Sequence, residues 1–281
     1  MSRRSLSMAG LPPRETSSIA GWARGLSRFA LVLLVTASLG HRYGLVETVA
    51  FFWVLGIVFC LAVLAACLAA GGFAMLWNRG ARAGRASLAA ALVSAIVLAP
   101  FVAGAVNVVR LPALSDISTD LVEPPLFEAA QRFRGPGMNR IVPIGHAAAE
   151  AQLHAYPQLA GRRFPASFER VVAAALAVIE ARGWTLQAPV PDEPRNGELS
   201  IEVFAPTFAI RFPVDAVIRL TDEGESTFVD MRVNSRYGRH DMGDGARRIR
   251  AFMADLETEF ERQSLAIIDI PESPEEEDPV D

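Results

Sequence analysis

The sequence contains no lysine, only two cysteines and only four histidines among its 281 residues. Cys60 and Cys67 both lie in the longest apolar run, where seven residues of helix separate them by roughly 10 Å along the axis, too far for a disulfide. The histidines lack metal-ligand spacing, because His146 and His154 are not the four-apart pair of a zinc protease helix. We therefore expect no disulfide between the cysteines, no metal and no cofactor.

Acidic residues are almost absent from the first 111 positions, which carry ten Arg against Glu15 and Glu47. Residues 112–281 reverse this balance, with 17 Arg against 29 acidic residues. Because a nucleic-acid-binding protein must neutralise phosphates with clustered cations, the acidic second half argues against DNA or RNA as a partner. The hydrophobic content of 51% instead indicates membrane spans beside one modest soluble domain.

Three apolar runs predict a transmembrane region over residues 23–110, with spans at about 24–42, 49–76 and 86–109. The second and third runs are uncharged and long enough to cross a hydrocarbon core of about 30 Å. The first run is shorter, and it reaches membrane length only if its terminal arginines extend to the two interfaces. Whether residues 24–42 cross the membrane decides the side on which the rest of the chain lies.

Two basic segments predict the orientation of these spans. Residues 1–22 form an arginine-containing leader that we expect to be disordered, and Arg79–Arg85 is a short basic loop. The positive-inside rule places both segments in the cytoplasm, and they share a side only if three helices cross. The three-span arrangement leaves the C-terminal domain outside the cytoplasm, which makes the protein an integral, multi-pass membrane protein.

The remaining chain has the pattern of an α+β domain over residues 111–264, followed by an acidic disordered tail over residues 265–281. Helical periodicity predicts a short helix over 147–156 and longer helices that begin at Ser167 and near Asp241. Between the longer helices, four or five antiparallel strands are expected, and the two helices should cover their sheet. The expected strands are 184–190, 199–205, 208–212, 214–221 and 226–234.

The stretch Ser226–Arg250 is the centre of this domain. Its strand alternates apolar and polar residues with the period of a strand that has one buried face. The strand leads into a polar turn, in which Asp241 is placed to cap the following amphipathic helix. Asn196-Gly197 is a tight-turn signal between two of the earlier strands.

These patterns resemble the DUF1499 family, an uncharacterised group whose bacterial members often place a few membrane helices before one soluble domain. The resemblance spans roughly residues 114–260. The residues that carry it are Asp116, Thr119-Asp120, Pro124-Pro125, Phe127, Ala155-Tyr156-Pro157, Phe212, Asp215 and Ser235-Arg236-x-Gly238-x-x-Asp241-x-Gly243 with Arg247 and Ile249. It implies a membrane-attached domain, here in the bacterial inner (cytoplasmic) membrane with the soluble part in the periplasm, and it implies no activity.

Charged residues around the strand end and the polar turn form the candidate site. Its members are Asp116, Thr119, Asp120, Asp230, Arg236, Arg239, Asp241 and Arg247. The arginines suit an anionic head group, which a guanidinium binds through two parallel hydrogen bonds. The alternative is a salt-bridge and capping network that fixes the turn, in which Arg236 and Asp241 interact and the glycines supply backbone freedom.

Three functions remain open at this point. The sequence favours a non-enzymatic, extracytoplasmic module that binds or assists a membrane or envelope partner protein. A domain that binds a lipid or a small anionic ligand is the alternative. An envelope hydrolase is less favoured, because Ser235, His240 and Asp241 have the composition of a triad without a nucleophile-elbow pattern around the serine.

Overall fold

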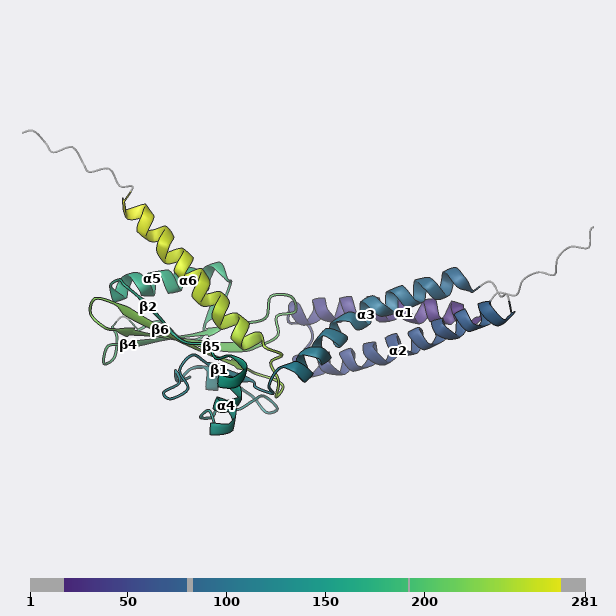
Figure 1. Cartoon of the computed structure of the whole chain (residues 1–281), viewed down its shortest axis with the longest axis horizontal. Helices are drawn as coiled ribbons and strands as arrows, with labels where there is room; N and C mark the ends of the chain where they lie inside the picture. The colour runs from purple at the N-terminus through teal and green to yellow at the C-terminus, as the bar shows by residue number, and fades with distance from the viewer. Residues whose placement is uncertain (1–17, 80–82, 192, 269–281) are drawn as a thin grey trace, which may run out of the picture. The chain divides into compact units, whose positions relative to one another are not determined.

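The computed structural model describes residues 18–79, 83–191 and 193–268 (Figure 1). The chain divides into two compact units, Met1–Val106 and Asn107–Asp281. The leader predicted for residues 1–22 lies outside the described residues up to position 17, and helix begins at Ser18. The predicted acidic tail also lies outside them from position 269 onward, whereas the last helix continues to Ile268.

The first unit contains two helices and most of a third that are long and apolar enough to cross a membrane, which confirms three candidate spans. They are α1 (Ser18–Arg42), α2 (Thr48–Arg79) and α3 (Gly84–Arg110). Small residues let them pack closely, since Ala23, Ala69 and Ala90 form one buried cluster. Gly72 meets Ser87 so closely that a Cβ on the glycine would clash with the serine Oγ.

The second unit is built on an antiparallel sheet, as the sequence predicts. Its long strands are β4 (Glu198–Phe204), β5 (Val214–Asp222) and β6 (Thr227–Ser235), and its short ones are β1 (Asp116–Ser118), β2 (Arg162–Phe164) and β3 (Thr185–Leu186). The order is β1-β6-β5-β4-β3, and β2 also pairs with β6. The short strands β1 and β2 escaped prediction because three residues are too few to show a period.

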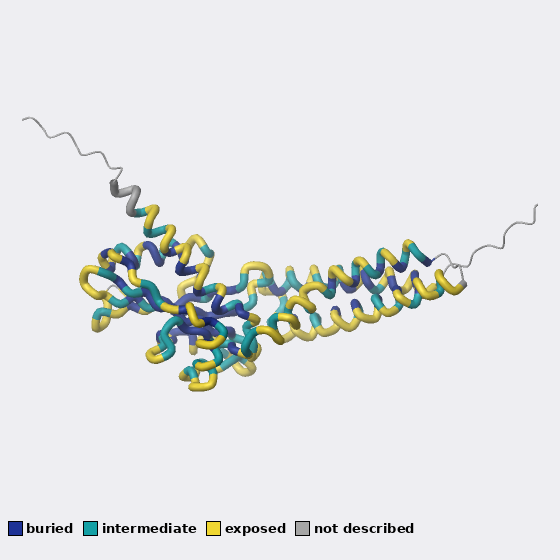
Figure 2. The backbone as a smooth tube through the Cα atoms, in the orientation of Figure 1, coloured by how far each residue is buried: buried dark blue, intermediate teal, exposed yellow. Residues whose placement is uncertain are grey.

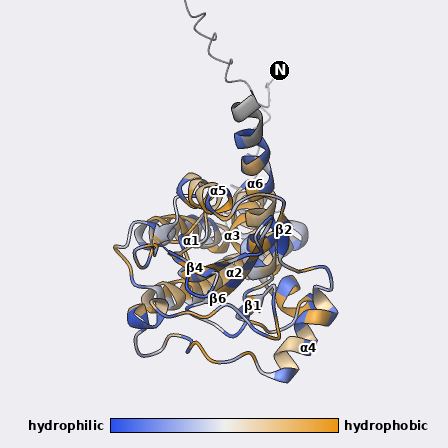
Figure 3. Ribbon diagram, turned by 90° about the vertical axis from the view of Figure 1, so that its left-hand side faces the viewer, coloured by the Kyte–Doolittle hydropathy of each residue, from blue (hydrophilic) through white to orange (hydrophobic). Residues whose placement is uncertain are grey.

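Two amphipathic helices, α5 (Phe168–Ala181) and α6 (Asp244–Ile268), lie side by side on one face of the sheet (Figure 1). Hydrophilic and hydrophobic residues lie next to one another along α6 (Figure 3). Its apolar residues Ile249, Phe252 and Leu256 are buried against the strands, and Trp184 stacks on Phe252. This apolar layer is the main core of the domain.

Two strand predictions were wrong: one strand is shorter than predicted, and one predicted strand is a turn. The strand expected over 184–190 has only the two residues of β3. Residues 208–212 form a turn, not a strand, because Pro206 and Pro213 bound the segment and Arg211 has a positive φ of 53°. The Thr207 hydroxyl accepts a hydrogen bond from the Phe212 amide, which closes this turn.

The Asn196-Gly197 turn is confirmed, since both residues have the positive φ that such a tight turn requires.

Burial of β6 also differs from the prediction of one buried face. All of its residues except Phe228 are buried, and Figure 2 shows the central strands as the most buried part of this unit. The second face is covered by residues 119–142, which we call the connector, together with the 3₁₀ helix η1 (Ala130–Phe133) within it. The alternating pattern gave a wrong prediction because the polar residues of β6 are buried and paired with other polar groups. In the sequence, such residues look the same as residues exposed to solvent.

Candidate functional site

The connector is held to the second face of the sheet by charged side chains. Arg232 of β6 is almost fully buried and forms a two-pronged salt bridge with Asp116, through Nε at 2.9 Å and Nη2 at 2.7 Å. The same guanidinium donates to the carbonyls of Pro125 and Val142, which lie on either side of η1 in the connector. One buried arginine thereby joins β1, β6 and two parts of the connector.

Thr119, Asp120 and Asp230 are brought together around Arg219 of β5. Nη2 of Arg219 lies 2.9 Å from a carboxylate oxygen of each aspartate. The Thr119 hydroxyl donates to Asp230 and accepts from the Met231 amide. Burial alone would raise the pKa of Asp120, but the amides of Glu123 and Val122 and the Arg219 guanidinium together hold it below its ordinary value.

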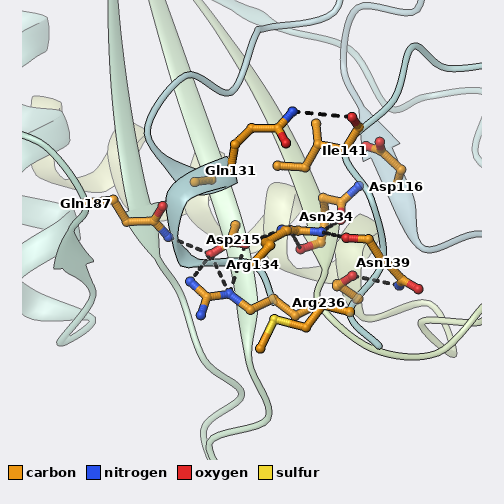
Figure 4. A network of polar contacts seen from close by, with 12 residues as sticks. Asp116, Gln131, Arg134, Asn139, Ile141, Gln187, Asp215, Asn234 and Arg236 are labelled. Carbon is orange, nitrogen blue, oxygen red and sulfur yellow. Dashed lines mark hydrogen bonds and ion pairs between the residues drawn. The ribbon is translucent and has the colours of Figure 1, made fainter. Parts of the chain in front are cut away.

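Asp215 of β5 is the centre of a third group, seen in Figure 4. Its side chain is 0% exposed and accepts hydrogen bonds from Arg134, Arg236 and Gln187. Arg134 also donates to the Asn139 carbonyl and to the Asn234 side chain. The prediction that Arg236 interacts with Asp241 was wrong, because the buried Asp215 carboxylate binds Arg236 instead.

Asp241 caps α6, as the sequence predicts. Its carboxylate accepts from the amides of Gly243 and Gly245, both at 2.8 Å. Burial raises the pKa of this carboxyl group above its ordinary value, and these two amides only partly offset the effect. The capping role accounts for the Gly243 and Gly245 spacing, and Gly243 also has a positive φ of 77°.

The ring of His240 is engaged by backbone groups on both sides. Nδ1 accepts from the Met242 amide at 2.8 Å, which places the proton on Nε2, and Nε2 donates to the Leu111 carbonyl at 3.1 Å. Neither nitrogen is left for Ser235, so these three residues do not have the geometry of a serine triad. Arg239 and Arg247, by contrast, are exposed members of the predicted site.

The eight predicted site residues therefore fall into separate places. Asp116 pairs with Arg232, whereas Thr119, Asp120 and Asp230 surround Arg219. Arg236 belongs to the Asp215 group, and the last three residues lie in the turn and the first turns of α6. The sequence did not identify Arg134, Arg219 or Glu202 as members of the site. For Arg219 and Glu202, the only signal was a polar residue at alternate positions of a strand.

A cleft of 360 Å³ opens at the β4 side of the sheet. Its walls are the connector around Leu126 and Arg132, the loop that includes Pro189 and Pro191, and strand β4. Glu202 of β4 holds the connector wall in place, because its carboxylate accepts from the amides of residues 128, 129 and 130 at 2.6–2.8 Å. The described residues contain no group of three potential metal ligands.

The comparison with protein families supplies the assignment. Residues 116–256 match the family described as a protein of unknown function, DUF1499, over just more than half of the chain. No curated protein matches the chain. The matched region begins at the first residue of β1 and ends within α6, so it includes every strand of the sheet. The chain therefore belongs to the DUF1499 family.

Proposed function

We propose that this protein is a membrane-anchored, non-enzymatic module that binds an extended segment of a partner protein in the cleft beside β4. The proposal assigns residues 23–110 to the anchor and residues 111–264 to the binding domain. It places the anchor in a bacterial inner membrane and the domain in the periplasm, on the basis of the two basic segments that flank the first two spans.

A gap at Ser200 in the pairing along the outer side of β4 is the observation that carries this proposal. β4 pairs with β5 over its whole length, but β3 pairs only with Phe204 and Val203. The Glu202 carbonyl accepts from Gln187 on the β3 side, and Glu198 pairs there with Arg195. Ser200 lies between them, so its amide and carbonyl point to that same side, away from β5, and it lines the cleft.

An extended peptide suits such an edge, because its main chain supplies the donor and acceptor that Ser200 needs. Within the described residues, no backbone group outside the β4–β5 ladder bonds to Ser200. Apolar side chains at Leu126 and Val190 line the cleft, and charged side chains of both signs, including Arg132 and Glu193, surround it. A peptide that carries an apolar residue between polar ones matches this lining.

The two competing functions have less support. A domain that encloses a whole lipid calls for an enclosed apolar cavity, whereas this cleft is open and has charged walls. A hydrolase of the triad type calls for a free histidine nitrogen beside a serine, and both nitrogens of His240 bond to backbone groups.

A photo-crosslinking residue in place of Arg195, at the rim of the cleft, tests the proposal in cells that make the full chain. We expect a crosslinked partner peptide, identified by mass spectrometry, and we expect Ser200→Pro to abolish it. Proline removes the amide that points into the cleft and leaves the β4–β5 ladder intact. Ser200→Thr keeps that amide and should retain the crosslink.

Two results would contradict the proposal. If Ser200→Pro folds and gives the same crosslink as the wild type, the partner does not pair with the main chain of β4. A matched control places the crosslinker at Glu169, which is exposed on α5 on the opposite face of the sheet. A crosslink at Glu169 with none at Arg195 would move the binding surface away from the cleft.

A further inference from the structure

The polar turn before α6 is fastened to the chain directly after α3. His240 donates to the carbonyl of Leu111, which is the residue that follows the last residue of α3. Asp241 donates its amide to the Leu114 carbonyl at 2.8 Å. The turn is therefore bonded to the residue that directly follows α3, a candidate membrane span that ends at Arg110.

Exposed cations gather at this turn. Arg239, Arg247 and Arg250 are all exposed, and the Arg247 side chain retains 60% of its surface. The guanidinium of Arg250 lies over the Tyr156 ring at 5.5 Å, and Nη1 of Arg247 donates only to the Met242 carbonyl, at 3.2 Å. No salt bridge to a carboxylate is present for Arg239 or Arg250 among the described residues.

The nearby carboxylates do not neutralise these arginines. Asp241 faces inward and is engaged by the amides of Gly243 and Gly245. Asp244 bonds to Arg248 at 2.6 Å and reaches Arg247 only at 3.8 Å. The exposed surface of the turn is therefore cationic although the soluble half of the chain is acidic.

A buried hydroxyl gives a second, independent observation. Tyr156 is 7% exposed, and its hydroxyl is buried without a hydrogen-bond partner among the described residues. A Cβ at Gly243 would lie 3.4 Å from this hydroxyl, 3.5 Å from Nη1 of Arg247 and 2.7 Å from Cδ1 of Leu111, so both donors lie next to Gly243, beside the Leu111 side chain. A phosphate oxygen supplies the acceptor that this hydroxyl lacks.

We propose that Arg239, Arg247 and Arg250 form a site for the phosphate of an anionic phospholipid in the leaflet where α3 ends. The arginines bind the phosphate through paired N–H donors, with the Tyr156 hydroxyl beneath them. Met242, which is 41% exposed beside them, contacts the upper part of the acyl chains. A bilayer lipid is the occupant because the residue before Leu111 ends a membrane span. This inference is independent of the cleft beside β4.

The test uses the full chain in detergent micelles, titrated with fluorescent phosphatidylglycerol. We expect Arg239→Ala/Arg247→Ala to raise the Kd at least about tenfold, and Tyr156→Phe to raise it about threefold. The matched control Arg132→Ala/Arg195→Ala removes the same charge from the rim of the cleft and should leave the Kd within about twofold. Both doubly substituted chains change only exposed side chains, and equal thermal midpoints show that each has folded.

Three competition experiments distinguish binding of an anionic lipid from binding of any lipid or of free phosphate. Unlabelled phosphatidylglycerol should displace the probe, whereas phosphatidylcholine and inorganic phosphate should not. Equal Kd values for the wild type and Arg239→Ala/Arg247→Ala would overturn the proposal. Full displacement by inorganic phosphate would also overturn it, because the site would then take a free anion and not a lipid.

Discussion

Arg134 and Asp215, which are 81 positions apart in the chain, form a buried salt bridge of 2.6 Å between Nη2 and Oδ2. Arg134 follows η1 in the connector, and Asp215 lies near the start of β5. The pair therefore fixes the connector to the sheet, and Arg236 completes it from the end of β6. Because the Asp215 carboxylate binds both guanidinium groups, loss of Asp215 breaks both salt bridges, whereas loss of either arginine breaks only one.

Asp215→Asn should lower the free energy of unfolding by about 3–5 kcal/mol, because it strands two arginines with little access to water. Arg236→Ala removes only one partner and should cost about 1–3 kcal/mol. Urea unfolding of the full chain in detergent, followed by circular dichroism, measures both. Glu223→Gln, which breaks an exposed pair with Arg163, should leave the midpoint unchanged. Equal losses for Asp215→Asn and Glu223→Gln would show that the buried network does not stabilise the domain.

The stabilising effect of Asp120 should depend on pH. Because its pKa is lowered in the folded state, the ionised carboxylate favours folding above its ordinary pKa, and this stability is lost as the pH falls through the folded value. The stability difference between wild type and Asp120→Asn should therefore shrink below about pH 4. Thermal unfolding midpoints measured between neutral and acidic pH test the trend.

Asp241 provides a control of opposite sign. Burial raises its pKa, so its contribution favours folding below the ordinary pKa and is lost as the pH rises through the folded value. The stability difference between wild type and Asp241→Asn should therefore fall with rising pH. If the Asp120 and Asp241 substitutions show the same pH trend, the assignment of their environments is wrong.

The soluble domain should fold alone only if it keeps the residues directly after α3. A fragment that begins at Asn107 retains the Leu111 and Leu114 carbonyls, which accept from His240 and Asp241. A fragment that begins at Ser115 loses these two hydrogen bonds and the buried Leu114, and it should be about 2–4 kcal/mol less stable. Urea midpoints of the two purified fragments decide the matter, and identical midpoints would refute the role of residues 107–114.

Orientation can be read with two reporters fused after Phe260. A reporter that works only outside the cytoplasm should be active there, because three crossings place the domain on that side. A cytoplasmic reporter at the same position should stay silent. The same pair fused in the loop after Arg79 should give the reverse result. A silent outer reporter together with an active cytoplasmic one after Phe260 would reject the three-span orientation.

Much of the fold was readable from periodicity. The apolar runs predicted three membrane helices, and the 3.6-residue spacing of residues such as Val171 and Phe252 predicted the helices that cover the sheet. Asn196-Gly197 and Asp241 were recognised because a tight turn and a helix cap each require particular residue types. These features depend on residues close together in the sequence.

The site was harder to predict because its contacts join distant segments. Asp230 and Arg232 were read as the exposed side of a strand, and nothing local indicates that the connector covers them. Arg236 was paired with Asp241, its neighbour in sequence, although its partner Asp215 comes from another strand. The spacing of charged residues in the sequence does not indicate which of several oppositely charged residues will be the salt-bridge partner.

The attachment of α3 to β1 has a mechanical consequence. Only five residues separate Arg110 from Asp116, and two of them, Leu111 and Leu114, are bonded to the turn before α6, so tension on α3 reaches this turn first and β1 next. β1 pairs with β6, an inner strand of the sheet, and the Asp116–Arg232 bridge spans that pairing. A pull on α3 therefore also loads β6, and the two-pronged Asp116–Arg232 bridge is the first ionic contact to bear it.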